Sequence, residues 1–238
     1  MEPSCRPGID LQAAAVWEDA VVAGVIDELL RRIAGFHRSR SAVPEYPMVD
    51  EVLGALDEAR SPALLEPRNL PVLRHLDTVE RSGDPAIDAV LEEFLSLAPA
   101  LPWIQTAGYR GVLSDEFHEN YGYVQLVGPN SIVEHRCVRV GIAVWGPNLH
   151  YPSHHHEAEE LYHVLAGEPS FTGSDGASRM MRPGDSVHHA PWQPHQQDFG
   201  ATPTVLLYCW TGAVVADAAL TDATLAGSES LLRPRRRP

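Results

Sequence analysis

Apolar residues in the first hundred positions of the chain recur at helical spacing. Between residues 15 and 36 they return at steps of three and four, which predicts an amphipathic helix that ends near Gly35. A later helix is predicted to begin with Asp84 as its N-cap and Pro85 at its first helical position. We therefore predict that residues 1–102 form a helical region. Its other helices are expected at 49–60, 70–82 and 84–101.

From Trp103 onward the pattern changes to short runs rich in β-branched and aromatic residues, separated by glycine and proline. Many short strands at such spacing are typical of a sandwich or barrel, so we predict a mainly β barrel region over residues 103–222. The N-terminal helices either pack outside this barrel or form a subunit interface. The runs lie at 123–128, 137–146, 161–167, 170–173, 178–184, 186–191, 195–200 and 204–212.

Composition and charge narrow the class of protein. The chain has 238 residues and is 44% apolar, which suffices for one compact domain with a large core. Its net charge of −14 argues against nucleic acid as a partner, because such binding depends on clustered Lys and Arg. The chain nevertheless ends in a short arginine-rich stretch, and we expect residues 223–238 to form a disordered basic tail.

Membrane and secretion signals are missing from the sequence. No run approaches the roughly 20 apolar residues of a membrane span, and the N-terminus has neither the basic nor the apolar region of a signal peptide. The three cysteines, Cys5, Cys137 and Cys209, are odd in number and far apart, which fits a reducing compartment. We expect a cytoplasmic protein without a membrane partner.

Histidines gather in one short window of the β-rich region. Of the twelve in the chain, seven lie between His154 and His195, a concentration typical of a metal site. Within this window His154, His156 and Glu160 follow the spacing H-x-H-x3-E. Residues two apart in a strand share a face, so His154 and His156 can offer two imidazoles to one ion while His155 faces the other way.

A second run, PGDSVHHAPWQPHQQ at 183–197, supplies the fourth candidate ligand. Its proline and glycine predict a turn, SVHHA a short strand, and residues 191–194 another turn that ends on His195. We take His195 as the ligand, and His189 is the alternative within this run. Three imidazoles and one carboxylate suit a single divalent transition metal ion, and Zn²⁺, Fe²⁺, Mn²⁺, Co²⁺ and Ni²⁺ all fit this donor set.

Tyr162 is the candidate catalytic residue. The alternation of its segment places Glu160, Tyr162 and Val164 on one face, so the phenol lies beside the metal. A phenol has an ordinary pKa of about 10, but a divalent cation close by favours the phenolate and makes it a base at neutral pH.

The two motifs resemble those of a known superfamily. H-x-H-x3-E-x6-G followed by a proline- and glycine-bounded histidine is similar to the metal motifs of the cupins, which are small antiparallel jelly-roll barrels. Within the cupins, Y-P-x-H-x-H-x-A-E-E-x-Y-x-V-L-x-G followed by P-G-x-x-V-H-H-x-x-x-x-P-H resembles the dimethylsulfoniopropionate lyase family, and the likeness covers residues 107–212. The fold class implied is a cupin jelly-roll β-barrel with an N-terminal α-helical extension.

The resemblance also implies a reaction. It makes the protein a metal-dependent lyase for a small zwitterionic carboxylate, dimethylsulfoniopropionate. The metal binds its carboxylate, Tyr162 removes the proton from the adjacent carbon, and dimethyl sulfide leaves acrylate behind. Tyr151 is expected to hold or orient this substrate. The chain departs from the family's usual residues at Gln196, Gln197 and Asp198, positions that we expect to border the pocket.

Two tryptophans are further candidates for substrate binding. Trp210 in the last strand and Trp192 beside His195 can each present an aromatic face, which attracts a sulfonium through its quadrupole. Two other classes of function use the same ligands, namely an iron-dependent cupin dioxygenase and a non-catalytic cupin that binds a small molecule. Because cupins often pair through strands, we also expect a homodimer.

Overall fold

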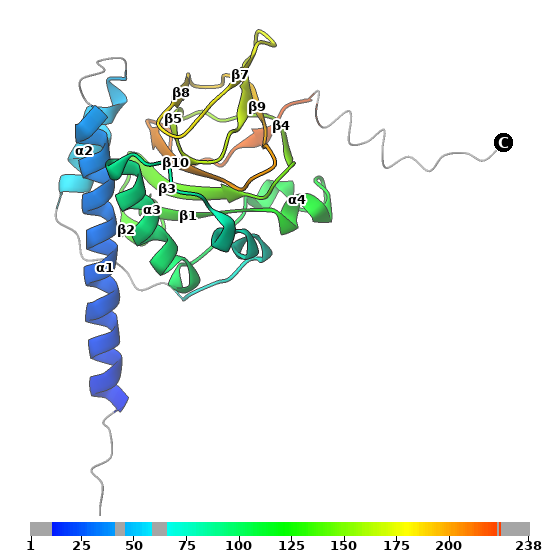
Figure 1. The fold of residues 1–238 in the computed structure, drawn as a ribbon. Helices are drawn as coiled ribbons and strands as arrows, with labels where there is room; N and C mark the ends of the chain where they lie inside the picture. Colours follow the sequence, from blue (N-terminus) through cyan, green and yellow to red (C-terminus); the bar gives the residue numbers. More distant parts are fainter. Residues whose placement is uncertain (1–10, 41–45, 59–65, 223, 225–238) are drawn as a thin grey trace, which may run out of the picture.

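The structure, a computed structural model, describes residues 11–40, 46–58, 66–222 and 224 (Figure 1). The predicted basic tail at 223–238 lies outside these residues apart from position 224, as does Cys5. The boundaries drawn at residues 102 and 222, and the homodimer, stay predictions.

Helices occupy the N-terminal part of the chain, as predicted. Asp84 caps α3, where its side chain accepts hydrogen bonds from the N–H groups of Ala86 and Ile87, and this confirms the predicted N-cap. None of the helices among the described residues is long and apolar enough to cross a bilayer. The helical elements are α1 (Leu11–Arg40), α2 (Met48–Asp57), η1 (Pro71–Thr78), α3 (Pro85–Leu97), η2 (Ala98–Ala100), η3 (Ala107–Tyr109) and α4 (Asp115–Glu119).

The first helix does not end near Gly35, so that predicted boundary is wrong. α1 continues to Arg40. A glycine inside a helix costs only about 1 kcal/mol relative to alanine, whereas the next two side chains, Phe36 and His37, are each 1% exposed. Burying these rings stabilises the extra turn by more than the glycine destabilises it.

The strands form two sheets that face each other, which confirms the mainly β, cupin-like fold. Their orders are β2-β1-β3-β10-β5-β8 and β11-β4-β9-β6-β7, and among the described residues no pairing joins them into one continuous barrel. All neighbouring strands are antiparallel except β1 and β2. The strands are β1 (Tyr121–Gly128), β2 (Val133–Glu134), β3 (Val138–Trp145), β4 (His150–His155), β5 (Glu159–Ala166), β6 (Ser170–Thr172), β7 (Ser178–Met180), β8 (Ser186–His189), β9 (His195–Asp198), β10 (Thr204–Thr211) and β11 (Ala219–Leu220).

Two hydrophobic clusters lie on opposite faces of the six-stranded sheet. The cluster between the two sheets includes Tyr162 of β5 and Phe171 of β6. The cluster on the outer face includes Leu161 of β5 together with Ile33 of α1 and Phe94 of α3. The helices therefore pack outside the sheets (Figure 1), and the alternative role in a subunit interface stays a prediction.

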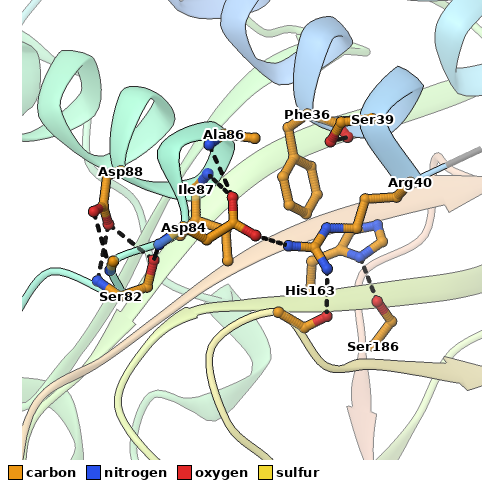
Figure 2. A network of polar contacts seen from close by, with 12 residues as sticks. Phe36, Ser39, Arg40, Ser82, Asp84, Ala86, Ile87, Asp88, His163 and Ser186 are labelled. Carbon is orange, nitrogen blue, oxygen red and sulfur yellow. Dashed lines mark hydrogen bonds and ion pairs between the residues drawn. The ribbon is translucent and has the colours of Figure 1, made fainter.

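The side chain of Arg40 connects the end of α1 to two other segments of the chain (Figure 2). Its Nη2 lies 2.7 Å from Oδ2 of Asp84, the N-cap of α3, and its Nη1 donates to the carbonyl of Gly184 at 3.3 Å. One guanidinium thus joins α1, the start of α3 and the loop before β8.

Buried rings complete this contact between α1 and the sheet. Phe36 meets the ring of His163 edge-on at 5.0 Å, and His163 Nδ1 lies 2.6 Å from the hydroxyl of Ser186 (Figure 2). His37 Nε2 lies 3.6 Å from Sγ of Cys209 in β10. These side chains occupy the outer faces of β5 and β10, so the inner faces are left to line the space between the sheets.

Candidate metal centre

Three side chains from three strand ends meet between the two sheets. His156 follows β4, Glu160 lies in β5, and His195 begins β9. Nε2 of His156 lies 3.0 Å and Nε2 of His195 lies 3.3 Å from the same carboxylate oxygen, Oε2 of Glu160. The candidate ligand atoms of the three residues all lie within 4.8 Å of one another, a grouping of nitrogen and oxygen donors that could hold one metal ion.

Strand pairing explains this meeting. His154 of β4 is the direct partner of His195 of β9, and a register shift separates this pair from the one formed by Tyr151. A tight connection after His156 returns the chain along β5 and brings Glu160 to the same place. His154 and His156 are 1% and 3% exposed, as expected for residues that both face inward.

The predicted histidine ligands share one hydrogen-bond arrangement. Nδ1 of His154 lies 2.9 Å from the carbonyl of Pro152, and Nδ1 of His156 lies 2.9 Å from that of Ala158. Nδ1 of His195 lies at the same distance from the carbonyl of Gln193. A carbonyl can only accept, so each Nδ1 donates a hydrogen bond and each Nε2 is the ring atom left to face a metal ion. These residues therefore fit a metal ion.

The charge balance at Glu160 points the same way. Glu160 is 1% exposed, and this burial by itself disfavours its ionised form. The charge of His156 and its hydrogen bond outweigh burial and hold the pKa of Glu160 well below its ordinary value. Conversely, burial lowers the pKa of His156, but the Glu160 carboxylate raises it above the ordinary value. The buried carboxylate thus depends on adjacent positive charge, which a divalent cation would supply.

His154 and His189 flank the three-residue group without belonging to it by ligand-atom distance. The ring centroid of His154 lies 4.2 Å from that of His195, and burial lowers the pKa of His154 well below its ordinary value, which keeps the imidazole neutral. His189 stacks on His195 with ring centroids 3.8 Å apart, and burial lowers its pKa to about 3. The group therefore contains His195 and not the alternative His189.

Both predicted catalytic tyrosines line a cavity of about 450 Å³, measured with its opening to solvent. Burial, and then the carboxylate of Glu160, raise the pKa of Tyr162 well above its ordinary range. The phenol is therefore protonated at neutral pH unless a positive charge lies beside it. Tyr151 stacks on His154 with ring centroids 4.0 Å apart, and its hydroxyl lies 2.8 Å from that of Tyr109.

The two predicted tryptophans lie in different places. Trp210 lines the cavity, its indole N–H donates to Oε1 of Glu160 at 2.5 Å, and its ring stacks on His156. Trp192 lies outside the cavity wall, 55% exposed, with its ring against His155. Its backbone has a φ of +62°, and its N–H donates to the carbonyl of His156 at 2.7 Å. The turn therefore uses the backbone of Trp192 near the site and directs the ring outward, contrary to the prediction.

The positions where the chain departs from the resembled family do not line this cavity, although we expected them to border it. Gln197 is fully buried in β9, where it is the strand partner of Tyr151. Asp198 lies on the other face and its Oδ1 is 2.7 Å from Nδ1 of His150. Gln196 and Asp198 alternate with the buried residues of β9.

Sequence reasoning missed several residues of the cavity wall. Arg139 is the one charged residue in the otherwise apolar run of β3, and that contrast was the available sequence signal. In the structure its side chain is only 8% exposed. Tyr208 of β10 and Asp217 carry no comparable signal in the sequence. The missed members of the wall are Thr106, Tyr121, Tyr123, Arg139, Ala143, Trp145, Tyr208, Asp217 and Ala218.

Comparisons with known proteins show what the chain is similar to. A model of the dimethylsulfoniopropionate lyase family matches residues 47–206, which include all four predicted ligands. Dimethylsulfoniopropionate lyase DddQ of Ruegeria pomeroyi is 26% identical over 168 residues, which are 70% of this chain and 83% of that protein.

Solved structures establish the fold. A chain from the crystal structures of the lyases RdDddP and RnDddQII matches with a TM-score of 0.71 and 24% identity, covering 84% of this chain and 98% of that one. The crystal structure of DddQ from Ruegeria pomeroyi matches with a TM-score of 0.69 and 24% identity, covering 83% and 96%.

Proposed function

The chain belongs to the dimethylsulfoniopropionate lyase family, a family of carbon–sulfur lyases, and from this premise we propose that it cleaves dimethylsulfoniopropionate to dimethyl sulfide and acrylate by metal-dependent β-elimination. One observation carries the proposal beyond the family. A buried carboxylate and two imidazoles whose Nδ1 atoms face backbone carbonyls converge beside an aromatic cavity that is lined by the buried phenol of Tyr162.

The residues that would hold the ion are His154, His156, Glu160 and His195. When bound, the divalent cation supplies a Lewis acid that favours negative charge on Tyr162 and on the carboxylate end of the substrate. The hydrogen bond from Trp210 to Oε1 of Glu160 supports this assignment, because it orients the carboxylate and leaves Oε2 facing the imidazoles.

Tyr162 is the base in this proposal. Its phenolate takes the proton from the carbon next to the substrate carboxylate. The electron pair of that C–H bond forms the carbon–carbon double bond, and the bond to sulfur breaks with its pair on sulfur. Neutral dimethyl sulfide and acrylate are the products, and the proton remains on the oxygen of Tyr162. Neither an oxidant nor an organic cofactor is required.

The aromatic wall suits the other end of the substrate. Tyr121, Tyr123, Tyr151 and Trp145 line the same cavity, and aromatic faces attract a sulfonium group while excluding water. We assign Tyr151 to this wall, where its contact with His154 and its hydrogen bond to Tyr109 fix the ring. Trp210 is a wall residue as well, and its ring already contacts the imidazole of His156 and the guanidinium of Arg139.

The test is the release of dimethyl sulfide into the headspace over protein loaded with each candidate metal. Tyr162→Phe should retain the bound metal and lose activity by about 10²- to 10⁴-fold, the usual contribution of a positioned base. Tyr46→Phe is the matched control, since Tyr46 stacks on His188 away from the cavity, and its rate should equal that of the wild type.

Two results would contradict the proposal. A wild-type protein that releases no dimethyl sulfide with any of the five metals is not a lyase for this substrate, and oxygen uptake by the iron form would then support the dioxygenase class. A Tyr162→Phe variant that keeps the full rate removes Tyr162 as the base and leaves the metal-dependent lyase intact.

A further inference from the structure

The cavity wall contains buried hydrogen-bond donors that no described protein group satisfies. They are Nε of Arg139, Nε1 of Trp145 and the hydroxyl of Tyr208. Each carries a hydrogen to donate, and the carboxylates of the wall already have partners, because Glu160 accepts from Trp210 and Asp217 pairs with Arg139. A buried donor without an acceptor costs free energy, so such a wall fits a ligand that brings acceptor oxygens.

Two hydrogen bonds hold the guanidinium of Arg139, and its Nε has no partner among the described residues. Its Nη1 lies 3.1 Å from Oδ1 of Asp217, and its Nη2 donates to the carbonyl of Val215 at 3.2 Å. The guanidinium carbon lies 5.1 Å from the ring centre of Trp210. A guanidinium stays charged throughout the physiological range. Its Nε is a buried donor, and the residue lines the cavity.

The strand register brings Tyr208 next to this donor. On β3 and β10, Arg139 is the direct partner of Trp210, and Gly141 is the direct partner of Tyr208, so all four positions share the cavity face. A Cβ at position 141 would lie 2.4 Å from the hydroxyl oxygen of Tyr208. Glycine at this position therefore lets the phenol lie flat against β3, two residues along the strand from Arg139.

From this arrangement we propose that Nε–H of Arg139 and the hydroxyl of Tyr208 form a carboxylate-binding subsite in the cavity. The ligand class is a short-chain carboxylate, and, resting on the proposed function, the ligand is the carboxylate end of the lyase substrate and of acrylate. A carboxylate has about four lone-pair directions on its two oxygens, so these donors and a metal ion can share it. Arg139 and Tyr208 are then positioning residues that set the direction in which the substrate lies.

The subsite also separates the two ends of a zwitterion. With the carboxylate at Arg139 and Tyr208, the sulfonium end is left the tyrosine faces further along β1 and β4. Trp145, the third unsatisfied donor, lies six residues from Arg139 along β3, so it belongs to the other end of the cavity.

The experiment uses two probes that each carry one end of the substrate. Acrylate has the carboxylate without the cation, and trimethylsulfonium has the cation without the carboxylate. Calorimetric titration of the metal-loaded protein measures the Kd of each probe and requires no turnover. The variants are Tyr208→Phe and Arg139→Met, with Asp217→Asn and Trp145→Phe as comparisons. Thermal unfolding and metal content verify that each variant is folded and loaded.

We expect Tyr208→Phe and Arg139→Met each to weaken acrylate binding by about tenfold or more, as for the loss of a hydrogen bond to a charged group. Trimethylsulfonium should bind these variants at least as tightly as the wild type. Asp217→Asn removes the partner of Arg139 and keeps the Nε donor, so it should bind acrylate as tightly as the wild type or more tightly.

Three outcomes would overturn the subsite. These are a wild type that does not bind acrylate, equal losses for both probes in the Arg139 and Tyr208 variants, and a loss of acrylate binding confined to Trp145→Phe. A protein that binds acrylate through Arg139 and Tyr208 but releases no dimethyl sulfide would instead retain the subsite and contradict the proposed function.

Discussion

The indole N–H of Trp210 donates to Oε1 of Glu160 at 2.5 Å, and the same indole stacks on the imidazole of His156 with ring centroids 4.2 Å apart. Trp210 and Glu160 are direct partners on β10 and β5, so the backbone ladder fixes this contact. One side chain therefore orients two of the proposed metal ligands, as partners behind metal-binding residues commonly do.

Replacing Trp210 by Phe should weaken metal binding by about 10- to 100-fold, because the ring is kept while the hydrogen bond to Glu160 is lost. The affinity for Zn²⁺ can be measured by competition with a chromophoric chelator. Trp145→Phe is the control, since Trp145 stacks on Phe199 and has no contact with Glu160 among those described. Equal affinities in the wild type and Trp210→Phe would show that Glu160 needs no such support.

The glycine that closes the first histidine motif should not tolerate a side chain. Gly167 has a φ of +83°, and a Cβ there would lie 2.7 Å from the carbonyl of Pro203. Gly176 has a similar φ of +75° with nothing within 4 Å of a Cβ. In urea titrations the free energy of unfolding should fall by about 1 kcal/mol for Gly176→Ala and by about 3 kcal/mol for Gly167→Ala. The larger loss at position 167 arises because overpacking adds to backbone strain. Equal losses would mean that backbone strain alone explains the motif glycine.

Acid should weaken the contact between α1 and the sheet through His37. Burial lowers the pKa of His37 to about 4, below its ordinary value of 6.5. As the pH falls through this window the unfolded chain takes up a proton that the folded chain does not, so stability is lost on acidification. From pH 7 to pH 5 this amounts to about 2 kcal/mol.

Urea titrations of the wild type and of His37→Leu at both pH values isolate this effect. Between pH 7 and pH 5 the free energy of unfolding of the wild type should fall by about 2 kcal/mol more than that of the variant. Parallel losses in the two proteins would show that His37 titrates as an exposed imidazole does and that the helix contact is not acid-sensitive.

Asp84 has two separable roles, as the N-cap of α3 and as the partner of Arg40. Its side chain accepts from two backbone N–H groups, and the Arg40 and Asp84 side chains are 30% and 41% exposed. Asp84→Asn keeps the helix cap and should lower the free energy of unfolding by less than about 1 kcal/mol. Asp84→Ala removes the cap and should lower it by about 1–2 kcal/mol. Thermal or urea unfolding measures both, and identical costs would assign the whole effect to the ion pair.

Local sequence determined the elements and the inward-facing residues of the candidate site. The Asp84-Pro85 pair fixes the start of α3 because an aspartate cap and a proline at the first turn act within four residues. Within the first segment the pleat of the chain puts His154 and His156 on one face. Within β5 the same pleat puts Glu160 and Tyr162 on one face. The assignment of these residues as ligands and base remains a proposal, and the meeting of His156 and Glu160 with His195 depends on strand pairing.

Tertiary structure decided what depends on distant segments. α1 passes Gly35 because Phe36 and His37 bury their rings on β5 and β10, an energy no local pattern contains. Arg139 and Tyr208 share a wall only through the register of β3 with β10, and Trp192 points outward because its turn adopts a left-handed backbone. Spacing along one strand is set by covalent geometry, whereas these relationships are set by which surfaces pack together.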